Sequence, residues 1–215
     1  MIPRYAVSPM ADLFTDEARY GVWLEVEILA VEAWASLGVI PAEDALAVRK
    51  RASFTVDAVE ERERITEHDV AAFVDVVAAQ VGEPAGGWVH YGLTSSDVVD
   101  TAQCWTLTRA CDLLAGAAEQ LERALTNRAR EHRATPMVGR THGIHAEPTT
   151  FGAKLALWAL QVRRDRVRLA RAVPGAPEAP EVPEELPEVL PEAGWCDRAA
   201  LGVVAGWRRA ASAPG

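Results

Sequence analysis

The sequence has little cysteine, little lysine and no long apolar run. Its three cysteines, Cys104, Cys111 and Cys196, are too few and too scattered along 215 residues for a disulfide framework or a zinc site, so we expect reduced thiols in a cytoplasmic protein. No apolar stretch is long enough to cross a bilayer, and the N-terminus lacks the apolar core of a signal peptide, so we expect no membrane partner. The formal charge of −9 leaves nothing to offset phosphate repulsion, which argues against nucleic-acid binding.

Strand-like alternation of apolar and polar residues persists nowhere, whereas apolar residues recur at helical spacing over most of the chain. Thr15 is placed to cap a first helix that stops at Gly38. Further helices are expected over residues 41–49, 67–81, 97–132 and 148–171, with loops at 82–97 and 135–147. Ser96 or Asp97 would cap the longest of them, and Pro148 would occupy the first turn of the last. The predicted fold class is all-α.

The composition divides the chain into three parts. Residues 1–96 form the expected N-terminal helical domain, and residues 97–172 hold two long helices that would begin a helical bundle. Residues 173–215 contain seven of the thirteen prolines and a run rich in glutamate, which disfavour regular helix or sheet. We expect this tail to be disordered.

Two segments gather polar groups that a purely structural helical protein would not need. The first is His90-Tyr91-Gly92-Leu93-Thr94-Ser95-Ser96-Asp97. Its hydroxyls and backbone N–H groups precede the start of a long helix, which makes it a natural anion site. The alternative is that Ser95, Ser96 and Asp97 serve only as the helix cap.

The second segment is GRTHGIHAEP at 139–148, which carries Thr141, His142 and His145. The two histidines are three residues apart, but no further histidine or cysteine lies close in sequence, so we expect no metal site. A histidine with a pKa near neutrality can give or take a proton. A structural role for these histidines is the alternative.

His68-Asp69 and Arg4-Tyr5 are two further candidates. Adjacent helical residues such as His68 and Asp69 do not face each other, and Asp69 could simply cap a helix. Arg4 lies near the terminus, yet its guanidinium suits a phosphate through paired, charge-assisted hydrogen bonds.

Together these residues resemble the adenylosuccinate lyases, a family of the fumarase/aspartase superfamily. The matching elements run in the family's order and at its spacing from Met1 to about Ala172. They are Arg4-Tyr5, WLEVEILAVEAWASLGVIP, His68-Asp69, VHYGLTSSDVVDTA and GRTHGIHAEPTTFGAKLALW. The resemblance implies a C–N lyase that needs no cofactor, assembled as a homotetramer around a bundle of long helices.

The resemblance also implies a reaction, the β-elimination of fumarate from succinyl-AMP and from the succinylated carboxamide ribotide of purine biosynthesis. A base removes a proton beside a carboxylate, and the C–N bond breaks. By resemblance, His142 would be the general acid that protonates the leaving nitrogen, and His68 would assist it near the substrate phosphate. The residues expected to bind substrate are Arg4, Tyr5 and Asp69 for the nucleotide, and Thr94, Ser95 and Thr141 for the succinyl portion.

The family continues beyond Ala172 into more long helices and a loop whose serine is the base, and residues 173–215 do not resemble that part. We therefore expect a truncated or out-of-frame ending and little activity from this chain alone. Two other functions stay open. One is a non-catalytic partner of a full-length lyase, favoured by apolar residues such as Trp105 and Trp158 that an incomplete bundle would expose. The other is a different lyase or cycloisomerase of the superfamily.

Overall fold

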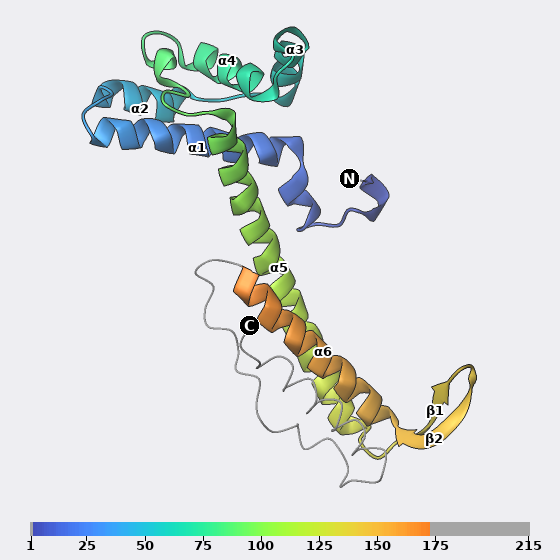
Figure 1. Cartoon of the computed structure of the whole chain (residues 1–215). Coiled ribbons are helices and arrows are strands. Elements are labelled where there is room, and N and C mark those ends of the chain that lie inside the picture. Colours follow the sequence, from blue (N-terminus) through green and yellow to red (C-terminus); the bar gives the residue numbers. More distant parts are fainter. Residues whose placement is uncertain (1, 173–215) are drawn as a thin grey trace, which may run out of the picture. The chain divides into compact units, whose positions relative to one another are not determined.

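The computed structural model describes residues 2–172, and the tail at 173–215, with Cys196, lies outside the described residues. The chain divides into two compact units, Met1–Leu113 and Leu114–Gly215. The described part is helical apart from one short hairpin, which confirms the all-α fold class (Figure 1). The domain boundary expected after residue 96 stays a prediction.

Four α-helices and three short 3-10 helices precede the long helix α5. They are η1 (Pro3–Tyr5), η2 (Ala11–Phe14), α1 (Asp16–Ser36), α2 (Ala42–Arg51), α3 (Val56–Thr66), α4 (Asp69–Val81) and η3 (Ala85–Trp88). Thr15 caps α1 as predicted, because its Oγ1 accepts the backbone N–H of Ala18 at 3.1 Å. Gly38 follows the helix end with a φ of +72°, a conformation that favours glycine.

The sequence prediction missed α3 and placed the start of α4 two residues early. Thr55 caps α3 by accepting the backbone N–H of Ala58 at 3.3 Å, and Glu67 follows its end in the left-handed region, with a φ of +51°. Val59 is the only residue that α3 buries completely, and six of its eleven residues are charged. Its many charged residues therefore look like a solvated segment.

An aromatic cluster fills the core of the first unit. It consists of Tyr20 and Trp23 of α1, Phe54 just before α3, and Phe73 of α4, and the touching rings have centroids 5.2 to 5.8 Å apart. Buried aliphatic side chains of α1 to α4 surround it. The cluster holds α1 and α4 together.

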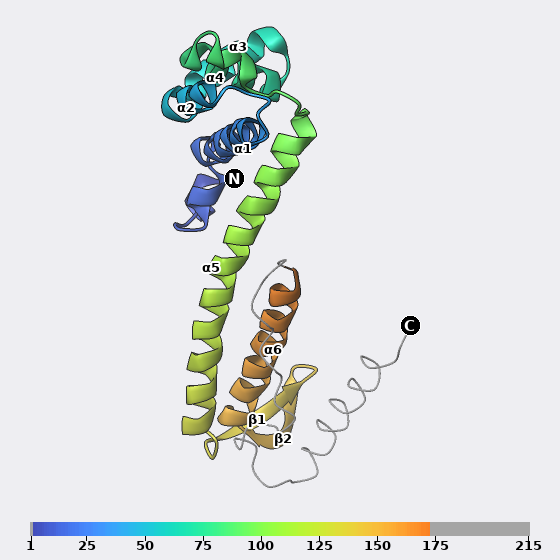
Figure 2. The same ribbon diagram turned by 90° about the vertical axis from the view of Figure 1, so that its left-hand side faces the viewer.

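Helix α5 (Ser95–Glu131) runs from the first unit into the second, where α6 (Phe151–Ala172) lies beside its C-terminal half (Figures 1 and 2). Ala129 of α5 packs with Leu155 of α6 in a small apolar cluster. The two backbones lie close together at Gly152, where an added Cβ would lie 2.5 Å from the backbone oxygen of Ala129. No larger residue fits there without a backbone shift.

A hairpin joins α5 to α6 where the sequence predicted a loop. Its strands, β1 (Pro136–Thr141) and β2 (Ile144–Thr150), pair antiparallel. Pro148 lies in β2 opposite Val138, and α6 begins only at Phe151, so the prediction that Pro148 opens the helix is wrong. Most hairpin residues are exposed, and the strands lack the apolar alternation that marks a half-buried sheet.

Candidate functional site

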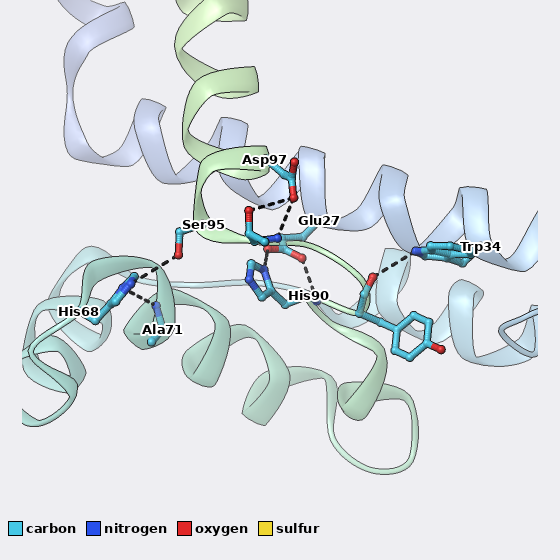
Figure 3. Close-up of polar contacts among 9 residues, drawn as sticks. Glu27, Trp34, His68, Ala71, His90, Ser95 and Asp97 are labelled. Atoms are coloured by element: carbon cyan, nitrogen blue, oxygen red, sulfur yellow. Dashed lines mark hydrogen bonds and ion pairs between the residues drawn. The ribbon is translucent and has the colours of Figure 1, made fainter.

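His68 and Ser95 come together in the first unit, although 27 positions separate them in the sequence (Figure 3). His68 is the N-cap of α4, since its Nδ1 accepts the backbone N–H of Ala71 at 3.3 Å. In the neutral ring the hydrogen therefore lies on Nε2. That atom is 3.4 Å from the Oγ of Ser95, the first residue of α5. The cap thus directs an N–H donor toward the start of α5.

Asp69 lies in the first turn of α4, beside His68. Its Oδ1 accepts the backbone N–H of Val70 at 2.8 Å and lies 3.5 Å from Nδ1 of His68. The alternative in which Asp69 caps α4 is wrong, because His68 holds that position. Both side chains are about half exposed, which leaves them accessible to a ligand.

Thr94 and Asp97 stabilise the first turn of α5. Asp97 Oδ2 accepts hydrogen bonds from the Thr94 backbone N–H at 2.8 Å and from its hydroxyl at 3.1 Å. These two bonds, the backbone one first, hold the pKa of the Asp97 carboxyl below its usual range. The helix begins at Ser95, so neither Ser96 nor Asp97 is the cap residue that the sequence suggested; Asp97 acts from inside the first turn.

Glu27 and His90 hydrogen-bond to each other at the start of the loop that precedes α5. His90 opens the polar segment that the sequence singled out, but neither His90 nor Glu27 was assigned a role at the predicted site. Glu27 of α1 is fully buried. Its Oε2 accepts the His90 backbone N–H at 2.9 Å, and its Oε1 lies 2.6 Å from the ring Nδ1 (Figure 3). A signal existed in the sequence: helical spacing from Trp23 and Val31 predicts an apolar residue at position 27. An acid at such a core position is rarely kept without a partner.

His142 lies at the tip of the hairpin in the second unit. His142 and Gly143 form its two-residue turn with φ values of +50° and +77°, as in a type I′ turn. Thr141 ends β1 directly before the turn, and both Thr141 and His142 are exposed. The turn therefore presents an imidazole and a hydroxyl together, the groups needed for proton transfer and anion binding.

His145 pairs with Arg140 across the hairpin, three residues after His142. Among residues 2–172, no group of three or more histidine, cysteine, aspartate or glutamate side chains is placed to hold a metal ion. None of the helices in this range has both the length and the apolar character that a membrane span requires.

Arg4 and Tyr5 form η1 near the N-terminus. The Arg4 guanidinium lies over the Tyr5 ring, 4.8 Å from its centroid, and both side chains are exposed. The structure therefore arranges the predicted site residues in three groups. Arg4 stacks on Tyr5, the second group is built around His68 and Ser95, and the third is the hairpin tip of the second unit.

These residues lie within a stretch that matches a known protein family. The family model described as "Lyase" matches residues 4–178, which include all three groups. The chain belongs to this lyase family. Its membership agrees with the fumarase/aspartase superfamily that the motifs indicated.

The curated relatives of this lyase-family chain include adenylosuccinate lyases. That of Bacillus subtilis is 51% identical over 175 residues, 81% of this chain and 40% of the relative. That of Streptococcus mutans is 46% identical over 175 residues, with the same coverage of 81% and 40%. The chain thus spans about two fifths of the length of these relatives. The predicted resemblance to the N-terminal portion of this family is confirmed.

Solved structures of the superfamily share the fold. A fumarate lyase from Mesorhizobium sp. BNC1 has a TM-score of 0.72 and 32% identity, and the match covers 78% of this chain and 40% of that one. A 3-carboxy-cis,cis-muconate lactonizing enzyme from Pseudomonas putida has a TM-score of 0.73 and 29% identity, covering 80% of this chain and 41% of the other. Different reactions therefore occur on this helical framework.

Proposed function

We propose that residues 2–172 provide the proton-donating and substrate-binding part of an adenylosuccinate lyase site. The reaction is the β-elimination of fumarate from succinyl-AMP and from the succinylated carboxamide ribotide. The observation that carries this proposal is the 51% identity with the Bacillus subtilis adenylosuccinate lyase across a stretch that contains both polar segments. The other superfamily enzymes named above match at 29% to 32% identity, so a different lyase or cycloisomerase activity is the second choice.

The geometry suits a substrate that carries a phosphate and two carboxylates. In the first unit, the N-terminus of α5 offers Thr94 and Ser95, and His68 offers an Nε2–H donor beside them. Such groups stabilise an anion, and they do so more strongly once the substrate excludes water. We assign the succinyl portion to Thr94, Ser95 and Thr141.

The family resemblance assigns three residues to the nucleotide. Asp69 is next to His68, and the exposed guanidinium of Arg4 can bind a phosphate in the paired manner that arginine favours. Tyr5, stacked under Arg4, restricts the directions in which that guanidinium can point. In keeping with the resemblance, we assign Arg4, Tyr5 and Asp69 to nucleotide binding, with His68 near the phosphate.

His142 is the proposed general acid. A protonated imidazole at the hairpin tip gives its proton to the nitrogen as the C–N bond breaks, so the amine leaves as a neutral group. A base removes the proton beside the carboxylate. The family resemblance assigns that base to a serine in a loop that residues 173–215 do not resemble, so we expect the 215-residue chain alone to release little fumarate.

The decisive experiment tests residues 4–172 within a full-length lyase. Residues 4–172 of this chain replace the matching residues of the Bacillus subtilis adenylosuccinate lyase, and fumarate release from succinyl-AMP is followed. We expect an active chimera. A folded chimera that binds succinyl-AMP without cleaving it, or does not bind it, would contradict the proposal.

A non-catalytic partner role has one observation in its favour. In the second unit, α5 and α6 leave large apolar side chains about half exposed, namely Leu114, Leu121, Leu157 and Trp158. Such side chains are typical of a surface that another helix covers. Co-purification with a full-length lyase would favour this role, and a monodisperse monomer in light scattering would argue against it.

A further inference from the structure

Glu27 is a carboxylate in the middle of an apolar core. It lies on α1 between Trp23 and Val31, both buried, and its own side chain is inaccessible to water. Removing a carboxylate from water is unfavourable unless hydrogen bonds replace its hydration. Both oxygens of Glu27 find those bonds at one residue, His90.

The pair sets the hydrogen positions on the His90 ring. An ionised carboxylate only accepts hydrogen bonds, so the ring Nδ1, 2.6 Å from Oε1, carries a hydrogen. Oε2 accepts the backbone N–H of the same residue at 2.9 Å. Glu27 therefore hydrogen-bonds to His90 at the backbone N–H and at the ring Nδ1, and this selects the Nδ1–H tautomer of the neutral ring.

The same two hydrogen bonds hold the backbone of His90 in an unfavourable conformation. His90 has a φ of +68°, in the left-handed region that side chains other than glycine seldom adopt. Trp34, two helical turns beyond Glu27, donates its indole N–H to the Tyr91 carbonyl at 3.1 Å. An added Cβ on Gly92, whose φ is +76°, would lie 3.2 Å from the Trp34 ring. One face of α1 thus supports the chain just before Thr94.

We propose that Glu27 is a positioning residue for the segment that carries Thr94 and Ser95. It acts through His90. The two hydrogen bonds fix the left-handed backbone conformation of His90, and this conformation sets where α5 begins relative to His68. The part of the inference that concerns substrate rests on the proposed function, whereas the part that concerns the loop does not.

Glu27→Gln separates the two parts. The glutamine has the same shape, and its amide oxygen can still accept the His90 backbone N–H. Its NH2 group then faces Nδ1, which must become an acceptor, so the ring hydrogen moves to Nε2. Glu25→Gln is the matched control, because Glu25 is on the same helix but half exposed and bonded to Arg49.

The measurement uses the full 215-residue chain labelled with nitrogen-15. Long-range proton–nitrogen spectra report the tautomer of each histidine, and the His90 signals are assigned by their loss in His90→Asn. We expect the Nδ1–H tautomer in the wild type and in Glu25→Gln, and the Nε2–H tautomer in Glu27→Gln. A His90 tautomer that does not change in Glu27→Gln would overturn the proposal.

Titration with succinyl-AMP in the same samples tests the link to substrate. We expect Glu27→Gln to raise the dissociation constant about tenfold, since the loop loses a charge-assisted hydrogen bond, and Glu25→Gln to leave it unchanged. Equal affinity in Glu27→Gln and wild type would overturn the substrate part. A wild-type chain that binds no succinyl-AMP would count against the proposed function, and the tautomer result would still decide the role of Glu27 in the loop.

His90→Asn and His90→Ala keep the test open if Glu27→Gln does not fold. Asparagine tolerates a positive φ, and its side-chain NH2 can replace Nδ1–H as a donor to Glu27. Alanine does not favour a positive φ and has no side-chain donor. Amide exchange at position 90 should therefore be at least about tenfold faster in His90→Ala than in His90→Asn. Equal exchange rates would overturn the proposal.

Discussion

Replacing Glu122 with glutamine is expected to weaken the contact between α5 and α6 in the second unit. Glu122 is 7% exposed. Its two oxygens accept hydrogen bonds from Nε of Arg163 and Nη1 of Arg166, both at 2.6 Å. Burial opposes ionisation of Glu122, but the bonds from Arg166 and Arg163 outweigh it and hold the pKa of this carboxyl below its usual range.

The size of the effect follows from the burial of the three groups. Breaking a fully buried ion pair costs about 3–5 kcal/mol, because it leaves an uncompensated charge. The side chains of Arg163 and Arg166 are 21% and 22% exposed, so hydration of the two guanidinium groups offsets part of that cost. We therefore expect Glu122→Gln to lower the local stability of α6 by about 2–3 kcal/mol at neutral pH. Glu119→Gln on the same helix removes an exposed pair with Arg123 and should cost about 0.5 kcal/mol or less.

The effect has a definite pH dependence. The folded-state pKa of Glu122 is lower than the unfolded value, which is about 4.3 for a glutamate. Its ionised form therefore stabilises the folded state above that unfolded pKa, and this contribution is lost as the pH falls through the folded pKa. The stability difference between wild type and Glu122→Gln should shrink in acid.

Hydrogen exchange of peptides from α6, corrected for the intrinsic rate at each pH, measures this local stability in the full chain. We expect faster exchange in Glu122→Gln at pH 7, and we expect the two rates to converge as the pH falls below the unfolded pKa of about 4.3 and through the lower folded pKa. Equal protection in wild type and Glu122→Gln at pH 7, or a difference that grows in acid, would refute the reasoning.

Further substitutions test other parts of the structure. Gly152→Ala should destabilise α6 in the same exchange assay by about 1–3 kcal/mol, because the new methyl meets the backbone of α5. Gly116 lies within α5 and has no atom near an added Cβ, so Gly116→Ala should instead stabilise the helix by about 0.5–1 kcal/mol. If both substitutions changed stability in the same direction, the close contact at Gly152 would be contradicted. Phe73→Ala, at a fully buried ring, should cost about 3–5 kcal/mol in urea unfolding, and a loss under 1 kcal/mol would argue against the aromatic core. In the chimeric lyase, His142→Ala should lower turnover about 10²–10⁴-fold with succinyl-AMP still bound, whereas near-normal turnover, or an equal loss in His145→Ala, would refute the acid assignment.

The helices with strong signals at their ends were predictable from sequence. Thr15 and Gly38 mark the two ends of α1, and both signals act within a few residues of the helix they delimit. Helix α3 was missed because its stability comes from burying Val59 against its neighbours, which a run of charged residues does not reveal. The hairpin was missed because its strands are exposed and only the turn at His142 and Gly143 marks them.

The candidate site shows the same division. Its residue types and order could be found along the sequence, since hydroxyls and histidines gather before helix starts. The link between His68 and Ser95 could not, because it depends on how α4 packs beside the start of α5. The role of Glu27 was also hidden, since its partner at His90 lies 63 positions away.

The sequence by itself determined the all-α class, the ends of the first helix and the family, because these depend on local capping, helical spacing and long specific strings. Tertiary structure alone decided which polar side chains meet. Hydrogen bonds act only over about 3 Å, so the partners of Glu27, His68 and Glu122 depend on helix packing that no local pattern encodes.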